Sequence, residues 1–212
     1  MFIDRRDAGQ KLAEALIDLR DRSQPIVVLA IPRGGVIIGH EVARSIHAPL
    51  DVILTHKLCA PDNPELAIGA IAEDGLTILL DQELLRQLQV SRAYLDAEID
   101  HQKREMQHRA VIYRRGRERV AVTHKIVIIV DDGVATGSTL IAALRSIRSA
   151  GAQELIAAVP VGPNQVVRRL RQEADRVVCL AMPIDFWAVG QYYERFEQVS
   201  DEDVIEAMTN EK

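Results

Sequence analysis

A short apolar run followed at once by two carboxylates constrains the fold of this chain more than any other stretch. Residues 126–130 read Ile-Val-Ile-Ile-Val, and all five are β-branched. An unbroken run of this kind is typical of a strand buried on both faces, as in a parallel sheet. Asp131 and Asp132 follow directly, and a small-residue turn then leads into a segment with helical apolar spacing. We therefore predict a strand, a tight turn and a helix over residues 126–147.

The turn after this strand is suited to bind a phosphate group. The first N–H groups of a helix have no partner within the helix, and the helix dipole adds partial positive charge there. Gly137 allows close approach of the backbone to an oxygen, and Ser138 and Thr139 add hydroxyl donors. Asp131 and Asp132 would repel a bare phosphate, so they favour a ligand that also carries hydroxyl groups or a metal ion. The sequence has neither the lysine of a P-loop at this turn nor a dinucleotide-binding G-x-G-x-x-G motif.

Residues 127–139, Val-Ile-Ile-Val-Asp-Asp-Gly-Val-Ala-Thr-Gly-Ser-Thr, resemble the phosphoribosyl-pyrophosphate (PRPP) motif of type I phosphoribosyltransferases. In that family the acidic pair binds the ribose hydroxyls, and the resemblance assigns this role to Asp131 and Asp132, with Mg²⁺ bound directly or through water. The following loop wraps the 5′-phosphate. The resemblance implies a loop of these residues: Gly133, Val134, Ala135, Thr136, Gly137, Ser138 and Thr139. The alternative is an ordinary strand–helix turn with a capping Ser or Thr.

A second glycine-containing loop follows the predicted strand at residues 26–31. It reads Pro32-Arg33-Gly34-Gly35, and a helix is predicted to run from there through Ile46. Paired glycines after a strand suggest a positive φ or a backbone that must approach a ligand closely. The loop resembles the pyrophosphate-binding loop of the same family, which often holds a cis peptide before its basic residue. The resemblance therefore implies pyrophosphate binding by Arg33, Gly34 and Gly35 and a cis Pro32–Arg33 bond; the alternative is a plain surface turn.

Residues 57–80 resemble the flexible lid of the family, which closes over bound PRPP. A strand is predicted at 51–55, and Lys57 just after it is the natural cation for the departing pyrophosphate, although it could equally be a solvated lysine. Residues 58–65 contain two prolines and several polar residues, which predicts a mobile loop. Apolar runs at 68–73 and 76–80, separated by Asp74-Gly75, predict a β-hairpin.

Proton transfer to or from the acceptor cannot involve the phosphate loop. Hypoxanthine-type enzymes of the family have an Asp for this purpose where this chain has Ala135, which cannot titrate. Adenine-type enzymes also have Ala there and use a Glu in the lid hairpin, a residue that Glu73 resembles. The resemblance thus implies a catalytic Glu73 beside Lys57 and Arg33, and it leaves the acceptor open.

Two segments lie outside these motifs. Residues 81–117 predict a helical insertion, with a long charged helix from Ser91 to about Arg114 that could be a surface brace, a dimer contact or part of the lid. Residues 182–212 form a C-terminal segment rich in aromatic residues. Phe186 and Trp187 resemble the aromatic residue that stacks on the base in purine phosphoribosyltransferases, which implies acceptor binding. The alternative is a flap whose aromatic side chains pack on the core.

The order of elements predicts a single α/β domain over residues 1–212. Alternating strands and helices indicate a doubly wound, mainly parallel sheet with helices on both faces, as in the type I phosphoribosyltransferases, with a lid hairpin and a C-terminal flap added. Ligands of such sheets bind at the carboxyl ends of the strands. Arg33, Lys57 and Asp131 all follow predicted strands, so one crevice could collect them.

Composition narrows the possible partners. The net charge of −5 argues against a nucleic-acid surface, which needs clustered Lys and Arg. The two cysteines are far apart and give neither a disulfide framework nor a metal motif. The chain has no apolar run of membrane-spanning length and no signal-like N-terminus, so we expect a soluble cytoplasmic protein without membrane contact. The oligomeric state is open, and a homodimer is possible.

By this resemblance, the chain transfers the 5-phosphoribosyl group of PRPP–Mg to a nitrogen nucleophile, expected to be a nucleobase-like heterocycle, and releases pyrophosphate. Such a reaction belongs to nucleotide metabolism. One alternative is a non-catalytic regulator that keeps the fold and senses PRPP or a nucleotide. Another is a Mg-dependent phosphohydrolase using Asp131 and Asp132, which the absence of a D-x-D nucleophile pattern at this strand end disfavours.

Overall fold

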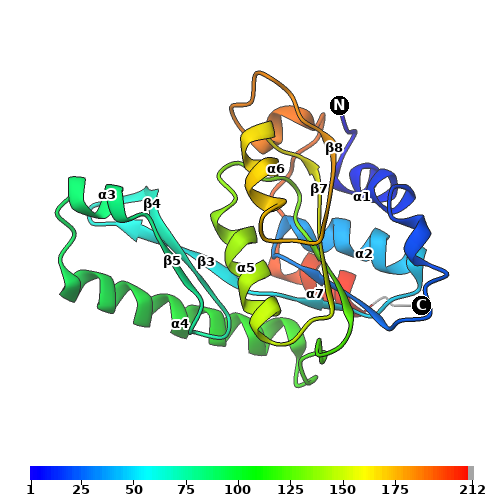
Figure 1. Cartoon of the computed structure of the whole chain (residues 1–212), viewed down its shortest axis with the longest axis horizontal. Coiled ribbons are helices and arrows are strands. Elements are labelled where there is room, and N and C mark those ends of the chain that lie inside the picture. Colours follow the sequence, from blue (N-terminus) through cyan, green and yellow to red (C-terminus); the bar gives the residue numbers. More distant parts are fainter. Residues whose placement is uncertain (210–212) are drawn as a thin grey trace.

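The body of the molecule is built on a parallel sheet of five strands in the order β2–β1–β6–β7–β8 (Figure 1). The computed structural model describes residues 1–209. The central strand, β6, is parallel to and hydrogen-bonded with β1 on one side and β7 on the other, and all of its residues are buried. This explains its unbroken β-branched run and confirms the predicted strand. The five strands are β1 (Ile26–Ala30), β2 (Leu50–Val52), β6 (Ile126–Val130), β7 (Glu154–Val161) and β8 (Arg176–Ala181).

Helices cover both faces of this sheet, as the doubly wound fold predicts (Figure 1). Successive residues of β6 point to opposite faces, so Ile128 and Val127 belong to two separate cores. The first core includes residues of α1 (Arg5–Glu14), α2 (Gly34–Ile46) and α7 (Asp201–Thr209). The second includes residues of α5 (Ser138–Ser149) and α6 (Asn164–Leu170). Two short 3₁₀ helices, η1 (Ile17–Leu19) and η2 (Val189–Tyr192), complete the body.

Residues 55–114 form an arm that projects from the body in Figure 1. Its sheet is antiparallel and consists of β3 (Thr55–Ala60), β4 (Asn63–Ala72) and β5 (Ile78–Leu80). A short helix, α3 (Gln82–Gln87), begins the predicted helical insertion, and the Asp81 side chain caps it by accepting a hydrogen bond from the N–H of Leu84 at 2.9 Å. The long helix α4 (Arg92–Arg114) then runs from the tip of the arm back to the body (Figure 1).

The arm differs from the sequence prediction in two places. The strand predicted at 51–55 is divided, because β2 stays in the main sheet while β3 starts the second sheet at Thr55. The prediction of a loop at 58–65 is wrong, since most of these residues lie in β3 and β4, and the mobility expected of them stays a prediction. Pro64 is tolerated there because β5 pairs with β4 only at residues 69–71, so Pro64 is outside the three-stranded part of the sheet.

The hairpin predicted around Asp74-Gly75 is confirmed as the β4–β5 connection. The Asp74 carboxylate accepts hydrogen bonds from the N–H groups of Leu76 and Thr77, both at 2.8 Å, which closes the turn. Whether residues 57–80 move as a lid stays a prediction.

The C-terminal segment returns across the carboxyl ends of the main strands. Phe2 and Tyr193 form an isolated parallel bridge, so residues from both ends of the chain lie side by side there. Ser200 and Asp203 cap α7 reciprocally. The last three residues of the segment predicted at 182–212 lie outside the described residues. Within residues 1–209, no helix has the length and apolar character needed to cross a membrane.

Candidate active site

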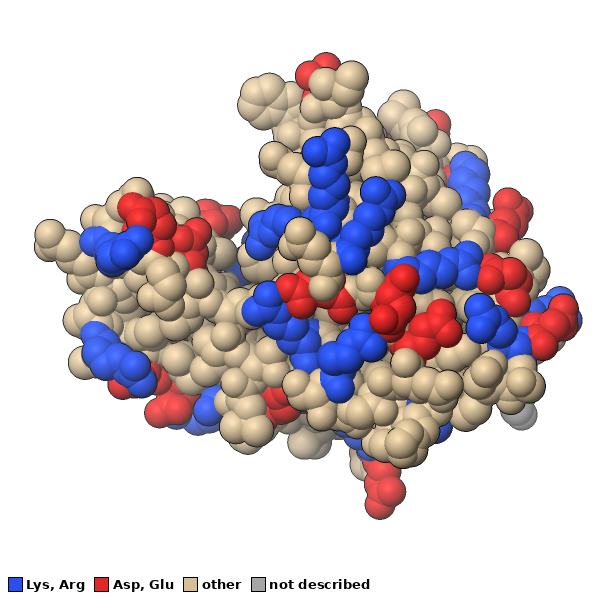
Figure 2. All heavy atoms as spheres, viewed as in Figure 1, with Lys and Arg blue, Asp and Glu red and all other residues tan. Residues whose placement is uncertain are grey.

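A cavity of about 820 Å³ lies where the arm meets the carboxyl ends of β1 and β6. The space-filling view shows the arm separated from the body by a notch (Figure 2). The predicted crevice is present, because Arg33, Lys57 and Asp131 all line this one cavity. Helix α4 and the C-terminal residues 196–199 contribute further walls that the sequence did not indicate.

The acidic pair lies on the body side of the cavity. Asp131 Oδ1 accepts a hydrogen bond from the N–H of Asp132 at 2.8 Å. Burial raises the pKa of Asp131 well above its ordinary value, and the neighbouring charge of Asp132 adds to the rise. Asp132 itself is held by an ion pair, with Arg5 Nε 2.7 Å from its Oδ2, and the hydroxyl of Tyr193 donates to its carbonyl oxygen at 2.6 Å. The pair is thus fixed by residues near both ends of the chain.

Arg5 is the most prominent residue of the cavity that the sequence did not reveal. Its Nη1 donates to the carbonyl oxygen of Glu197 at 2.6 Å, and its Cζ lies 3.8 Å from the centroid of the Phe196 ring. Only 12% of its side chain is exposed. It is separated from Asp132 by 127 positions in the chain, so no local sequence signal could have found the pair.

The phosphate loop at the start of α5 lies between two cavities. Gly137 has φ 81°, a left-handed conformation that favours glycine, and it occupies the N-cap position of α5. Thr139 lines the large cavity, whereas Ala135 and Thr136 line a second one. The side chain of Val134 is buried in the core, so only its backbone can face a ligand. The strand, turn and helix predicted here are confirmed; phosphate binding stays a prediction.

The loop after β1 packs against the acidic pair. Its Pro32–Arg33 peptide bond is cis, as the resemblance implied. A Cβ on Gly34 would lie 1.9 Å from Oδ2 of Asp132, and one on Gly35 would lie 2.9 Å from the carbonyl oxygen of Val130. Both glycines are therefore explained by close packing of two loops of the protein. Arg33 reaches toward Asp201 of α7, with 3.9 Å between Nη1 and Oδ1.

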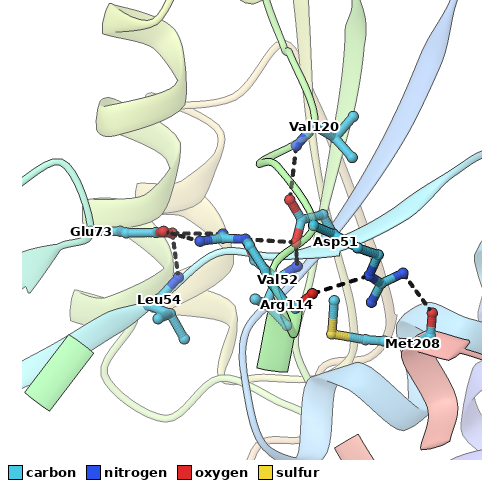
Figure 3. Close-up of polar contacts among 8 residues, drawn as sticks. Asp51, Val52, Leu54, Glu73, Arg114, Val120 and Met208 are labelled. Atoms are coloured by element: carbon cyan, nitrogen blue, oxygen red, sulfur yellow. Dashed lines mark hydrogen bonds and ion pairs between the residues drawn. The ribbon is translucent and has the colours of Figure 1, made fainter. Parts of the chain in front are cut away.

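Glu73 is not brought to the large cavity. Its carboxylate pairs with Arg114, where Nη2 lies 3.1 Å from Oε2, and it also accepts a hydrogen bond from the N–H of Leu54 at 3.3 Å (Figure 3). Both oxygens are occupied by partners that hold the arm in place. In this structure Glu73 therefore has a structural role, and its expected role in proton transfer stays a prediction.

Arg114 joins the arm to the body through this network (Figure 3). It also binds Asp51 Oδ1 at 3.1 Å and the carbonyl oxygen of Val52 at 2.9 Å. The side chains of Arg114, Asp51 and Glu73 are 9%, 4% and 13% exposed. Burial would lower the pKa of Arg114, but the two carboxylates outweigh it and raise that pKa. Helix α4 therefore braces the arm against the body, which is one of the roles that the sequence left open for it.

The second cavity, of about 580 Å³, lies beside the phosphate loop and is lined by Phe186 and Trp187. Phe186 stacks on Tyr192, with 5.5 Å between ring centroids, whereas 87% of Trp187 is exposed. The alternative interpretation, a flap whose aromatic side chains pack on the core, is therefore wrong for Trp187 but holds for Phe186 and Tyr192, which pack against the first core. Acceptor binding by these aromatic residues stays a prediction.

The acidic pair is suited to a magnesium ion that takes only some of its ligands from the protein and the others from a substrate. In the described part of the chain, no group of three His, Cys, Asp or Glu side chains is arranged to hold a metal ion. Mg²⁺ in enzymes is commonly bound by one or two carboxylates, with substrate phosphates and water completing its ligands. Asp131 and Asp132 meet that requirement.

Comparisons with known proteins agree with this geometry. Residues 65–196 match the family model described as "Phosphoribosyl transferase domain". Two proteins named "Putative phosphoribosyl transferase", from two strains of Mycobacterium tuberculosis, are 48% identical over 205 residues, or 97% of this chain. The match covers 46% of each relative, so this chain spans about half of their length. The crystal structure of TT1426 from Thermus thermophilus is 44% identical, with a TM-score of 0.80 over 98% of this chain and 97% of that one.

The matched region contains the acidic pair, the phosphate loop and Phe186 with Trp187, while the loop after β1 and Lys57 precede it. Sequence similarity and the arrangement of the large cavity lead to the same assignment. The chain belongs to the phosphoribosyl transferase domain family.

Proposed function

We propose that this chain transfers the 5-phosphoribosyl group of PRPP to a nitrogen atom of a small planar acceptor and releases pyrophosphate. The observation that carries the proposal is a single cavity lined by the acidic pair, Arg33, Lys57 and Thr139 of the phosphate loop. A carboxylate pair suits ribose hydroxyls, a helix N-terminus suits a phosphate, and two cations suit a pyrophosphate leaving group.

Each group then has a separate task in the reaction. Asp131 and Asp132 accept hydrogen bonds from the ribose hydroxyls and orient C1′, where an oxocarbenium-like state develops. The loop from Gly133 to Thr139 holds the 5′-phosphate. Arg33 and Lys57 stabilise the negative charge that grows on the departing pyrophosphate. Mg²⁺ held by Asp131 and Asp132 would supply further charge neutralisation at the phosphate oxygens.

The second cavity is the proposed acceptor pocket. Phe186 and Trp187 offer flat apolar surfaces for a planar heterocycle, and the pocket adjoins the phosphate loop at Ala135 and Thr136. Its described lining contains no Asp, Glu, His, Lys or Arg. We therefore propose an acceptor whose reacting nitrogen is already nucleophilic, or whose proton leaves to solvent, without a general base from this pocket.

A non-catalytic PRPP sensor is the second candidate, since a regulator could keep the same ribose and phosphate contacts. Lys57 and Arg33 favour catalysis, because a sensor has no need to expel pyrophosphate. The test is release of pyrophosphate from PRPP–Mg in the presence of purines, pyrimidines, nicotinate and small amines. Turnover with one of these acceptors supports the transferase. Tight PRPP binding without turnover on any of them would instead support the sensor.

A further inference from the structure

We propose that Arg109 of α4 and Thr55 of β3 form an anion subsite that binds the pyrophosphate group of PRPP together with Arg33 and Lys57. The inference rests on the proposed function and extends it. It assigns the long helix a task at the substrate in addition to bracing the arm.

Helix α4 presents one face to the large cavity. The residues that line it are His101, Gln102, Glu105 and Arg109. Glu105 follows His101 and Gln102 by four and three residues and precedes Arg109 by four, which places it on the same side of the helix as each of them. Arg109 is partly buried. The arginines at the two ends of α4 have carboxylate partners: Arg92 pairs with Asp96, and Arg114 pairs with Asp51 and Glu73. Arg104 is exposed to solvent.

The guanidinium of Arg109 makes no hydrogen bond or ion pair with any residue from 1 to 209, although Glu105 lies one turn away on the same face. A partly buried cation without a counter-charge is unfavourable unless a ligand supplies one. The neighbouring His56 does not compete as a cation, because burial lowers its pKa and outweighs the opposite effect of Gln102, whose Oε1 lies 2.8 Å from Nδ1 of His56.

Thr55 provides an independent observation on the strand opposite. It is only 7% exposed, it lines the same cavity, and its Oγ1 is buried without a hydrogen-bond partner within the described chain. A buried hydroxyl without a partner is destabilising, and valine would fill the same space without that cost. Rotation about the Cα–Cβ bond exchanges the hydroxyl and the methyl group, so Oγ1 can turn toward the cavity and donate to a ligand.

The position of these donors points to the pyrophosphate group. Thr55 and Lys57 are two residues apart on β3 and share a face of the strand, and Pro32 and Arg33 line the same cavity. The 5′-phosphate has its own loop at α5, and the acidic pair is suited to the ribose. A pyrophosphate group carries several negative charges and accepts many hydrogen bonds, which Arg109, Lys57, Arg33 and Thr55 together can supply.

Calorimetric binding of inorganic pyrophosphate in the presence of Mg²⁺ tests the subsite. We expect Arg109→Gln to weaken binding by at least about tenfold, since hydrogen bonds to charged groups are the stronger kind. Thr55→Val should weaken it by roughly threefold to tenfold while melting at the same temperature as the wild type or higher. Arg104→Gln is the matched control, because Arg104 is an exposed residue of α4 that does not line the cavity. Binding of ribose 5-phosphate should stay unchanged in all three variants.

Unchanged pyrophosphate affinity in both Arg109→Gln and Thr55→Val would overturn the subsite while leaving the proposed transferase intact. An equal loss of affinity for ribose 5-phosphate and for pyrophosphate in Arg109→Gln would also overturn it. Arg109 would then attract anions in general and would not form a subsite for pyrophosphate. Failure of the wild type to bind PRPP at all would instead refute the proposed function and this inference with it.

Discussion

The two sides of the large cavity are built differently. On the body wall, which consists of the acidic pair and the loop after β1, the side chains are already engaged: Asp132 binds Arg5, and Gly34 is in close contact with the same carboxylate. On the arm wall, formed by β3 and α4, Lys57, Arg109 and the Thr55 hydroxyl have no partner among the described residues. The body wall is therefore fixed by the fold, whereas the arm wall has donors that a ligand can satisfy.

This difference gives separate expectations for substitutions. Changes in the body wall should disturb the geometry of the ribose site. Changes in the arm wall should alter ligand binding or catalysis while leaving the stability of the fold nearly unchanged. The joint between the two parts, at Arg114, should matter most for stability.

Removing Arg114 should give the largest effect. Arg114→Met leaves Asp51 and Glu73 buried without their counter-charge, and breaking a buried ion pair from one side typically costs about 3–5 kcal/mol. Urea denaturation measures the loss. Arg92→Met on the same helix is the control, because its exposed pair with Asp96 should contribute less than about 1 kcal/mol. Similar losses of unfolding free energy in the two variants would show that Arg114 stabilises the fold no more than an exposed ion pair does.

Gly34→Ala tests the close packing of the body wall. The added Cβ would lie 1.9 Å from Asp132 Oδ2 and 2.7 Å from Arg5 Nε, so the acidic pair must move. Displaced carboxylates lose hydrogen bonds to the ribose hydroxyls, which are worth about 1.5–3 kcal/mol each, so we expect PRPP affinity to fall by roughly 10-fold to 100-fold. Titration calorimetry on the folded variant checks it. Wild-type affinity in this variant would mean that the position of the acidic pair is not critical.

Lys57→Ala tests the arm wall. Lys57 is exposed, so its loss should leave the melting temperature and ribose 5-phosphate binding nearly unchanged. The charge it meets grows mainly in the transition state, so kcat should fall by about tenfold or more. Steady-state kinetics with the acceptor found in the screen provides the measurement. An intact kcat combined with lost ribose 5-phosphate binding would contradict the proposed role.

Trp187→Ala should have the smallest effect on the stability of the fold, and it should weaken binding of the acceptor alone. Trp187 is 87% exposed, so the melting temperature should hardly change. Stacking on an aromatic side chain is worth roughly 1–3 kcal/mol per base, so the acceptor KM should rise about fivefold or more at constant PRPP affinity. A variant with unchanged acceptor KM would remove Trp187 from the pocket.

The sequence predicted the body well because its signals are local. The β-branched run at 126–130, the acidic pair and the glycine turn occupy one short stretch, and their strand, turn and helix are confirmed. The strand, turn and helix depend on neighbouring residues, which a single sequence displays directly. The cis Pro32–Arg33 bond is different, because only the resemblance of its loop to the family implied it.

Predictions for the arm were weaker because its structure depends on distant contacts. The prolines at 61 and 64 suggested a loop, but pairing of β3 with β4 leaves only Pro61 and Asp62 in a turn and places Pro64 in β4. Glu73 was assigned to catalysis, and its partner Arg114 lies 41 positions further along the chain. Arg5 and Arg109 reach the cavity only through the folded arrangement of the N-terminus and α4. No periodicity or motif marks such pairs.

The most direct test of the central claim is calorimetric binding of PRPP–Mg to the wild type and to the Asp131→Asn, Asp132→Asn double variant. Hydrogen bonds to charged acceptors contribute about 1.5–3 kcal/mol each, so we expect the double variant to bind at least about 100-fold more weakly. Asp131→Asn alone is the folding control. Because burial raises the pKa of Asp131, its ionised form costs stability at neutral pH, and this variant should melt no earlier than the wild type there. Unchanged PRPP affinity in a folded double variant would contradict the account.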